Sequence, residues 1–179
     1  MKNVVVVTSS PRRNGNSETL ARKFAEGAKN AGNAVEFVAV RDVNLLFCIG
    51  CMSCQKNLGK CVLKDGMNDL YEKFRTADVL AFATPVYYYS VCGQLKTFLD
   101  RLNPLFPLDN KFKDVYLLAT AAEDEDYTFD GCVKDIQGWI DCFDGVTLKG
   151  VIRGGGVSER GEVDNTDYPE QAYRAGEKV

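Results

Sequence analysis

The strongest constraint on this fold is the regular alternation of short apolar runs with amphipathic segments along the chain. The first run, residues 4–8, is almost entirely valine, which is typical of a strand buried on both faces of a sheet. The next segment, residues 17–31, places Leu20, Phe24 and Ala28 at every fourth position, which predicts a helix with one apolar face. A strand followed by a helix is the repeating unit of a parallel α/β sheet.

The same alternation continues to the end of the chain. It predicts further strands at residues 35–40, 79–83, 115–120 and 146–152, and helices at residues 67–77, 93–102, 129–143 and 169–178. Five strands alternating with helices imply one doubly wound parallel sheet with helices on both faces, and favour the flavodoxin-like order 2-1-3-4-5. We therefore predict a single α/β domain over residues 1–179, with a cysteine-rich insertion at about 44–66.

The composition excludes several classes of chemistry. The chain has 179 residues, a formal net charge of −3 and no histidine. Catalysis by a Ser-His pair and metal sites built on imidazole are therefore excluded, and the net charge provides no field that would attract nucleic acid. No apolar stretch approaches the roughly 18 residues of a transmembrane helix, and no signal peptide is recognisable. We expect a cytoplasmic protein that does not associate with membranes.

The segment after the first predicted strand has the composition of a phosphate-binding loop. Residues 9–17 are Ser-Ser-Pro-Arg-Arg-Asn-Gly-Asn-Ser, with Ser17 as the expected N-cap of the first helix. A helix N-terminus offers unpaired N–H groups and partial positive charge to a phosphate. The segment matches neither a Walker A loop nor a three-glycine dinucleotide loop. It favours a mononucleotide phosphate; the alternative is an ordinary turn with a capping serine.

A second candidate loop follows the third predicted strand. Residues 84–90 are Thr-Pro-Val-Tyr-Tyr-Tyr-Ser, and three consecutive tyrosines beside a proline are a poor continuation of a strand. On a loop at the sheet edge, these side chains would offer flat apolar faces to a planar heterocycle. The alternatives are local packing or a subunit interface, and an interface is compatible with a bound heterocycle.

Together, these two segments resemble the NADPH-dependent FMN reductase family, a branch of the flavodoxin-like superfamily. The second motif is long, because the similarity continues from Thr84 through Gly93 into Lys96, Asp100 and Arg101. The cysteine-rich stretch makes the iron–sulfur flavoprotein branch the most similar. The resemblance covers nearly the whole chain and implies an FMN-dependent oxidoreductase. We assign no catalytic role to the helical Lys96 and Arg101, which we expect to be surface ion-pair residues.

The resemblance also implies which residues hold FMN. The first loop would bind the phosphate, the second would line the isoalloxazine, and the loop after the fourth strand would close the third side. The residues with these roles are Ser9, Arg12, Asn16 and Ser17, with Ser10 as a further donor; Pro85, Val86, Tyr87, Tyr88 and Ser90; and Thr120 and Ala121. The acidic run at residues 123–126 departs from the glycine-rich loop common in the family, and we expect it to be solvated.

Four of the seven cysteines are clustered, namely Cys48, Cys51, Cys54 and Cys61. The first three have the spacing of ferredoxin cluster ligands, and the last spacing resembles that of the iron–sulfur flavoproteins. Three interpretations stay open: a 4Fe–4S cluster that relays electrons to the flavin, a zinc ion held by four thiolates, or cysteines without metal, either reduced or with one disulfide. We expect the other three cysteines to be small buried side chains.

These expectations describe an oxidoreductase in which no side chain is catalytic, because FMN carries the chemistry. NAD(P)H would donate hydride as a transient co-substrate, and a small-molecule acceptor would take the electrons. One alternative is an iron–sulfur electron carrier that exchanges electrons with a ferredoxin-like partner. Another is a non-enzymatic module that binds a nucleotide or a protein. The resemblance further implies a homodimer or a larger homo-oligomer.

Overall fold

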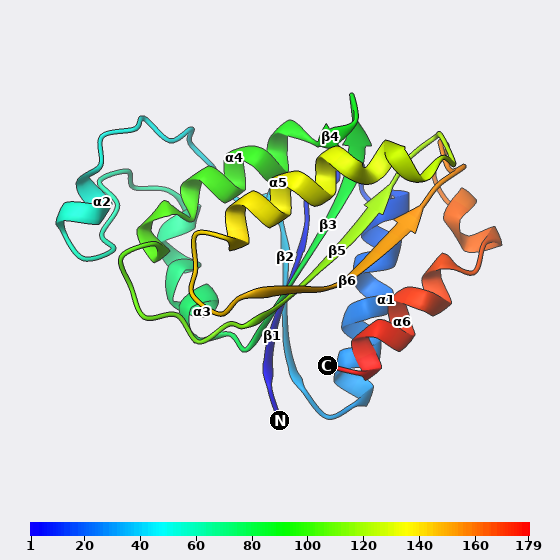
Figure 1. Ribbon diagram of the computed structural model, residues 1–179, viewed down its shortest axis with the longest axis horizontal. Helices are drawn as coiled ribbons and strands as arrows, with labels where there is room; N and C mark the ends of the chain where they lie inside the picture. The colour runs from blue at the N-terminus through cyan, green and yellow to red at the C-terminus, as the bar shows by residue number, and fades with distance from the viewer.

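Five parallel strands in the order β2-β1-β3-β5-β6 form the sheet of the computed structural model, which describes residues 1–179 (Figure 1). Their bounds are β1 Asn3–Thr8, β2 Ala34–Ala39, β3 Val79–Tyr87, β5 Asp114–Thr120 and β6 Thr147–Gly154. Counted along the chain, the parallel strands have the predicted order 2-1-3-4-5, so the flavodoxin-like prediction is confirmed. The direction of winding reverses between β1 and β3, and ligands of such sheets bind at this switch point.

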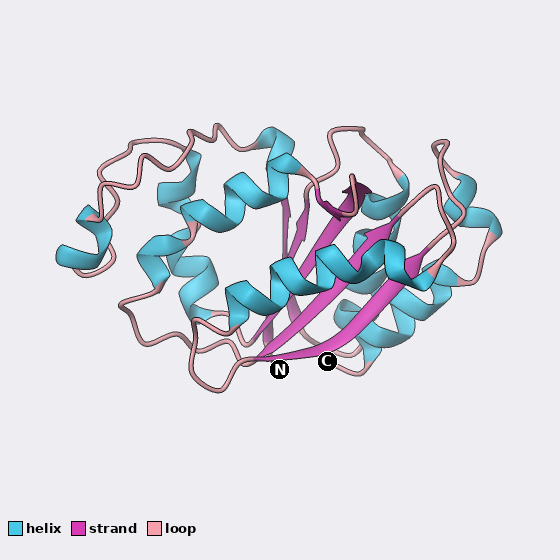
Figure 2. Ribbon diagram, turned by 45° about the horizontal axis from the view of Figure 1, so that its top comes forward, coloured by secondary structure: helices cyan, strands magenta, loops and turns pink.

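Helices cover both faces of the sheet (Figure 2). The α-helices are α1 Asn16–Asn30, α2 Ser53–Lys56, α3 Tyr71–Thr76, α4 Gly93–Arg101, α5 Asp130–Ile140 and α6 Tyr168–Glu177; short 3-10 helices are η1 Val40–Asp42, η2 Gly66–Asp69, η3 Asn103–Leu105, η4 Asp126–Phe129 and η5 Glu162–Asn165. Helices α1 and α6 pack on one face, and α3, α4 and α5 pack on the other. None of these helices is both long and apolar enough to cross a bilayer.

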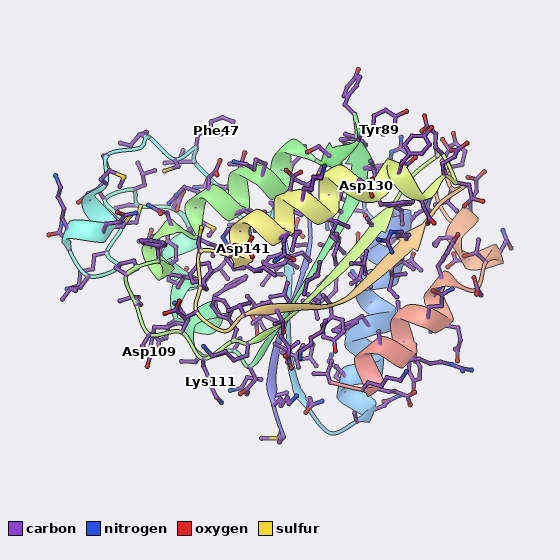
Figure 3. The ribbon with its side chains drawn as sticks, viewed as in Figure 1. Phe47, Tyr89, Asp109, Lys111, Asp130 and Asp141 are labelled. Atoms are coloured by element: carbon purple, nitrogen blue, oxygen red, sulfur yellow. The ribbon has the colours of Figure 1, made fainter.

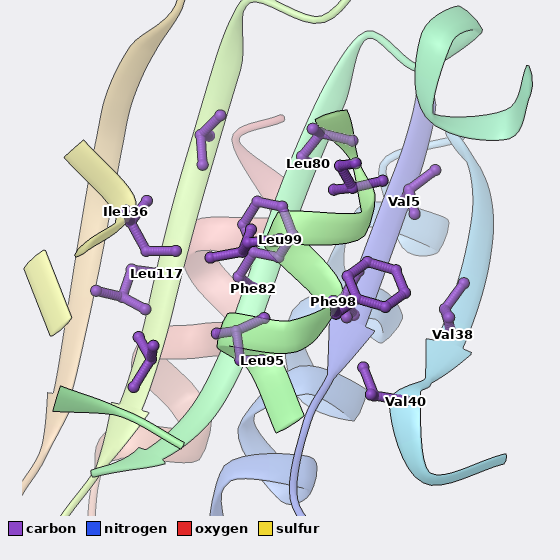
Figure 4. Close-up of a cluster of buried hydrophobic side chains, with 14 of the residues drawn as sticks. Val5, Val38, Val40, Leu80, Phe82, Leu95, Phe98, Leu99, Leu117 and Ile136 are labelled. Atoms are coloured by element: carbon purple, nitrogen blue, oxygen red, sulfur yellow. The ribbon is translucent and has the colours of Figure 1, made fainter. Parts of the chain in front are cut away.

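The valine run of β1 separates two hydrophobic cores. Val5 and Val7 point into a core of 26 buried residues beneath α3, α4 and α5, part of which is drawn in Figure 4. Val4 and Val6 point the other way, into a core of 14 buried residues beneath α1 and α6. Because successive strand residues alternate between faces, a strand between two cores must be apolar throughout. This is why the run lacks polar residues.

Helices α1 and α6 cross at two glycines. A Cβ on Gly27 would lie 2.0 Å from the carbonyl oxygen of Tyr173, and one on Gly176 would lie 2.1 Å from that of Phe24. Only glycine therefore allows the two backbones to approach this closely. The contact fixes α6, and with it the segment between β6 and α6, against the start of the chain.

Two of the predicted helices differ from the observed ones by more than one residue at a boundary. The predicted helix at residues 67–77 is divided into η2 and α3, because Asp65 caps η2 with hydrogen bonds that begin a separate turn. The predicted helix at residues 129–143 is confirmed only over Asp130–Ile140. The insertion at 44–66 contains one short helix, α2, and extends beyond the end of α4 (Figure 1, cyan).

The prediction of a loop at residues 84–90 is wrong for most of that segment. β3 continues through Pro85, which pairs with Thr120 of β5, and ends at Tyr87. The strand then folds back as the two-residue β4, Ser90–Val91, which pairs antiparallel with it. Proline has a low strand propensity because it lacks an N–H, but near the end of a strand this removes only one ladder hydrogen bond. The pairing with β5 outweighs that loss.

The turn between β3 and β4 is made by two residues with left-handed backbone conformations. Tyr88 has φ 50° and Tyr89 has φ 61°. Two positive φ values are the pattern of a type I′ hairpin turn, which usually contains asparagine and glycine. The carbonyl oxygen of Tyr89 packs against α5 at Gly131, which has no side chain. A Cβ on Gly131 would lie 1.8 Å from this oxygen.

Candidate functional site

A cleft of about 250 Å³ opens at the carboxyl ends of β1, β3 and β5. Its lining residues are Ser10, Arg12, Gly15, Asn16, Ser17, Pro85, Val86, Tyr87, Thr120, Ala121, Ala122, Val157 and Ser158. The three segments that the sequence singled out thus meet at the topological switch point. A fourth segment, at residues 157–158, also contributes, although it is not among the predicted site residues.

Most of the residues predicted to bind FMN line this cleft, but Ser9, Tyr88 and Ser90 do not. The hydroxyl of Ser9 is buried and donates to Ala83 O at 2.9 Å. The side chain of Tyr88 is 100% exposed at the hairpin turn. Ser90 Oγ donates to the carboxylate of Asp135 on α5 at 2.5 Å. The geometry of this chain therefore gives these three side chains structural positions, and their role toward FMN stays a prediction.

The N-terminus of α1 faces the cleft without a side-chain cap. The N-cap is Gly15 rather than the predicted Ser17, because the helix begins at Asn16 and Ser17 already lies in its first turn, and no side chain accepts from its first N–H groups. Gly15 is required for close packing, since a Cβ would lie 2.7 Å from Ser10 Oγ. Open N–H groups at a helix N-terminus, beside Arg12 and two serine hydroxyls, suit a phosphate.

The buried carboxylate of Glu18 stabilises the loop before α1. Glu18 accepts hydrogen bonds from Arg41 at 2.9 Å, from Arg22 at 2.5 Å and from Asn14 N–H at 2.9 Å. Burial opposes the charged form of this carboxyl, but the bonds from these three residues outweigh burial and lower its pKa. Arg41 also donates to Ser10 O at 3.4 Å. The two cations compensate the Glu18 charge, so the cleft retains its positive helix end.

The residues after β6 are fastened to the same loop. Asn16 Nδ2 donates to Glu159 O at 2.8 Å, and its Oδ1 accepts from Gly161 N–H at 3.0 Å. Arg12 Nη1 donates to Ser158 O at 3.1 Å. The side chain of Asn16 therefore holds the 157–163 segment over the cleft. The expectation that it binds phosphate directly stays a prediction.

The opposite wall of the cleft is the end of β3. The hairpin that carries Tyr87 is held by Asp135, which accepts from Ser90 Oγ and from Val91 N–H at 3.2 Å. Tyr89 OH donates to Glu123 at 3.0 Å. All four residues of the acidic run are exposed, as expected, and Glu123 in addition anchors the hairpin through this bond.

The four clustered cysteines line one small cavity of about 20 Å³ at the other end of α4. Cys48 and Cys51 are exposed, Cys54 is buried and Cys61 is half-buried. No three His, Cys, Asp or Glu side chains come close enough together to hold one metal ion, so the cluster, zinc and metal-free interpretations all stay predictions. A 4Fe–4S cluster takes one thiolate on each of four irons, and the four cysteines that line this cavity match that donor set in number and kind.

The remaining cysteines are only partly as predicted. Cys92 and Cys132 are buried, whereas Cys142 is exposed near the end of α5. Burial raises the pKa of the Cys132 thiol to about 12, so this side chain behaves as a small neutral apolar group.

The fold defines a flavodoxin-like protein with a cleft at the switch point of its sheet. The model of the NADPH-dependent FMN reductase family matches residues 2–126, and the chain belongs to this family. The predicted family is therefore confirmed, and the curated relatives below come from the iron–sulfur flavoprotein branch that the sequence suggested.

Two curated relatives are named iron–sulfur flavoproteins. One, from Methanocaldococcus jannaschii, is 36% identical over 111 residues, which cover 60% of this chain and 57% of the relative. Another, from Methanosarcina thermophila, is 34% identical over 95 residues, covering 53% and 49%. The chain spans about half the length of the curated relatives it matches.

Solved structures show the same fold at lower identity. An NAD(P)H:quinone oxidoreductase from Methanothermobacter marburgensis superimposes with a TM-score of 0.74 at 21% identity, covering 99% of this chain and 95% of that one. An azoreductase from Bacillus anthracis superimposes with a TM-score of 0.76 at 18% identity, covering 100% of both chains. These similarities confirm the flavodoxin-like architecture over the full length of the chain.

Proposed function

We propose that this protein is an FMN-dependent oxidoreductase that passes electrons from NAD(P)H through bound FMN to a small-molecule acceptor. The observation that carries the proposal is the cleft itself, which joins an uncapped helix N-terminus to an apolar strand end at the switch point. A mononucleotide has a phosphate at one end and a planar ring at the other, so it matches a cleft with these two surfaces. Family membership supports FMN as this mononucleotide.

The chain's own residues would bind and orient the cofactor. Ser10, Arg12 and the first N–H groups of α1 would hold the phosphate, and Pro85–Tyr87 would lie along the ring system. Thr120 and Ala121 would close the third side. When bound, FMN supplies the exchange of hydride and electrons, and the protein contributes position, exclusion of water and electrostatics. No acid or base side chain is required, which agrees with a chain that has no histidine.

The convergence of Cys48, Cys51, Cys54 and Cys61 supports a second candidate function. In that case the four thiolates would hold a 4Fe–4S cluster, and the protein would exchange electrons with a ferredoxin-like partner. The names of the curated relatives agree with such a cluster. Rapid reduction by reduced ferredoxin together with negligible reduction by NAD(P)H would favour this carrier over the reductase.

Exposed aromatic side chains support the further proposal that the protein forms homodimers. Tyr88, Tyr89 and Tyr127 are 100%, 48% and 58% exposed around the hairpin. Tyrosine is enriched at protein interfaces. Figure 3 shows Tyr89 at the outer edge of the molecule, on the side where Phe47 of the cysteine segment also lies. A second copy packed on the hairpin would lie beside the cleft.

The proposed function is tested by FMN binding to matched glycine variants. Gly15→Ala adds a Cβ that would lie 2.7 Å from Ser10 Oγ, whereas Gly138→Ala on α5 adds one with nothing within 4 Å. We expect Gly15→Ala to weaken FMN binding at least about tenfold, equivalent to about 1.4 kcal/mol, and Gly138→Ala to leave it unchanged. Anaerobic stopped-flow reduction by NADH and NADPH then follows on the wild type. Protein that binds no FMN, or equal binding by both variants, would contradict the assignment of the cleft.

A further inference from the structure

Arg101, the last residue of α4, is an arginine enclosed by the cysteine segment. Its side chain is 1% exposed, although arginine is rarely buried unless its charge is paired. It forms a salt bridge with Asp65 and donates to Leu46 O at 2.8 Å and to Tyr71 OH at 3.3 Å. Leu46 precedes the first clustered cysteine and Asp65 follows the last one. One guanidinium therefore holds both ends of the cysteine segment.

The two ends are also joined directly. Asp65 accepts from Leu46 N–H at 2.8 Å and from Met67 N–H at 3.1 Å. With Arg101 bonded to both Asp65 and Leu46, these groups form a closed ring at the base of the loop. The rest of the segment, from residue 47 to residue 64, extends from this base. The arginine thus fixes both ends of the segment relative to α4.

Two side chains at the end of α4 also donate toward cysteine sulfur atoms. Arg101 Nη2 lies 3.7 Å from Cys61 Sγ, and Asn103 Nδ2 lies 3.2 Å from Cys54 Sγ. Asn103 is kept in place because its Oδ1 accepts from Gln55 of α2 at 3.3 Å. Both donors line the same cavity as the four cysteines. They are therefore aimed at the two more enclosed sulfur atoms of the set.

The helix that ends at Arg101, α4, begins next to the other site. Cys92, the residue before α4, donates its backbone N–H to Thr84 Oγ1 of β3 at 3.2 Å, next to the strand end that walls the cleft. α4 has nine residues, so it spans about 14 Å at a rise of about 1.5 Å per residue. A rigid element thus separates the FMN-type cleft from the cysteine cavity by a fixed distance.

We propose that Arg101 and Asn103 are positioning residues that set the reduction potential of a 4Fe–4S cluster held by the four cysteines. This proposal rests on the cluster of the second candidate function. Hydrogen bonds to cluster sulfur atoms and nearby positive charge stabilise the more negative, reduced cluster, and so raise its potential. Asn103 supplies a neutral donor to Cys54, and Arg101 supplies a donor with a charge to Cys61.

The test compares three variants of the anaerobically purified holoprotein. Asn103→Ala removes one donor, and Arg101→Gln removes the charge. Arg101→Lys keeps the charge but lacks the planar guanidinium group. Gln94→Ala, at an exposed position near the start of α4, is the matched control. Iron and FMN contents are measured on each sample, and the cluster and flavin potentials are determined separately by mediated redox titration followed by EPR and absorbance.

We expect Asn103→Ala to keep its iron and to shift the cluster potential to a more negative value, with the flavin potential unchanged. Arg101→Gln should shift it further, Arg101→Lys should restore part of the shift, and Gln94→Ala should have no effect. Because Asn103 contributes no buried charge, its variant remains informative if Arg101→Gln fails to fold.

The contrary outcomes are distinct from one another. Fully loaded Asn103→Ala and Arg101→Lys proteins with wild-type cluster potentials would overturn the proposed role of these residues, and leave the cluster and the FMN site in place. Wild-type protein that binds FMN but takes up no iron after anaerobic reconstitution would overturn the cluster, and this role with it. Protein that takes up iron without FMN would instead overturn the proposed function of the cleft.

Discussion

Arg101 and Asp65 form a salt bridge in which the two side chains are 1% and 0% exposed. Removal of one partner of a buried pair leaves the other charge without compensation, which costs about 3–5 kcal/mol. We therefore expect Asp65→Asn to lower the free energy of unfolding by about 3 kcal/mol or more, measured by urea denaturation. Glu72→Gln, which breaks an exposed pair with Arg75, is the control and should cost less than about 1 kcal/mol. Equal effects of the two variants would contradict this account of the pair.

The same carboxylate makes stability depend on pH in the acid range. Burial would raise the pKa of Asp65, but hydrogen bonds from Arg101 and from two backbone N–H groups lower it below the ordinary value of 3.8. A lowered folded-state pKa contributes stability above the unfolded-state pKa, and this contribution is lost as pH falls through the folded-state value. Glu18 acts in the same direction. We expect the free energy of unfolding to fall below about pH 4, and less steeply in Asp65→Asn. A flat profile from pH 5 to pH 2.5 would contradict this expectation.

The close crossing of α1 and α6 predicts that alanine at position 27 destabilises the protein. Gly27→Ala places a Cβ 2.0 Å from the backbone oxygen of Tyr173, so the helices must move apart. We expect thermal denaturation to report a loss of about 1–3 kcal/mol. Gly138→Ala, also in a helix but with nothing within 4 Å, should stabilise the protein by up to about 1 kcal/mol. If both alanines stabilise the protein, the close approach of the two helices is incorrect.

The hairpin turn predicts a stabilising substitution at Tyr88. Its φ of 50° is unfavourable for tyrosine and favourable for asparagine at this position of a type I′ turn. Its side chain is 100% exposed, so little packing within the chain is lost. We expect Tyr88→Asn to raise stability by about 0.5–1 kcal/mol, with FMN affinity unchanged. A marked loss of FMN affinity would instead support the sequence-based prediction that Tyr88 contacts the cofactor.

The fold was accessible from the sequence because its signals are local. The valine run of β1 and the apolar spacing of α1 each indicate their own element, and the alternation of elements indicates a parallel sheet. The order of the strands then follows from the small number of topologies that such a sheet allows. The loop at residues 9–17 could be placed at the site for the same reason, since it follows the first strand.

The features that sequence reasoning missed depend on contacts between distant residues. Arg101 is a charged residue at the end of an amphipathic helix, and such a residue is expected to be exposed. It is buried only because the cysteine segment packs on the end of α4. Lys96 on the same helix is exposed and pairs with Asp100, as predicted. Val157 and Ser158 reach the cleft through bonds from Asn16 and Arg12, which no local pattern reveals. The general rule that ligands contact the loops after parallel strands would have indicated them.

The central claim is that the N-terminus of α1 binds the phosphate of FMN, and the affinities of FMN and riboflavin for the same apoprotein test it most directly. The two molecules differ only in the phosphate, and each charge-assisted hydrogen bond to it contributes about 1.5–3 kcal/mol. We expect FMN to bind at least about tenfold more tightly than riboflavin, since about 1.4 kcal/mol corresponds to a factor of ten. We also expect the difference to shrink in Arg12→Ala. Equal affinities of FMN and riboflavin for the wild-type protein would contradict the claim.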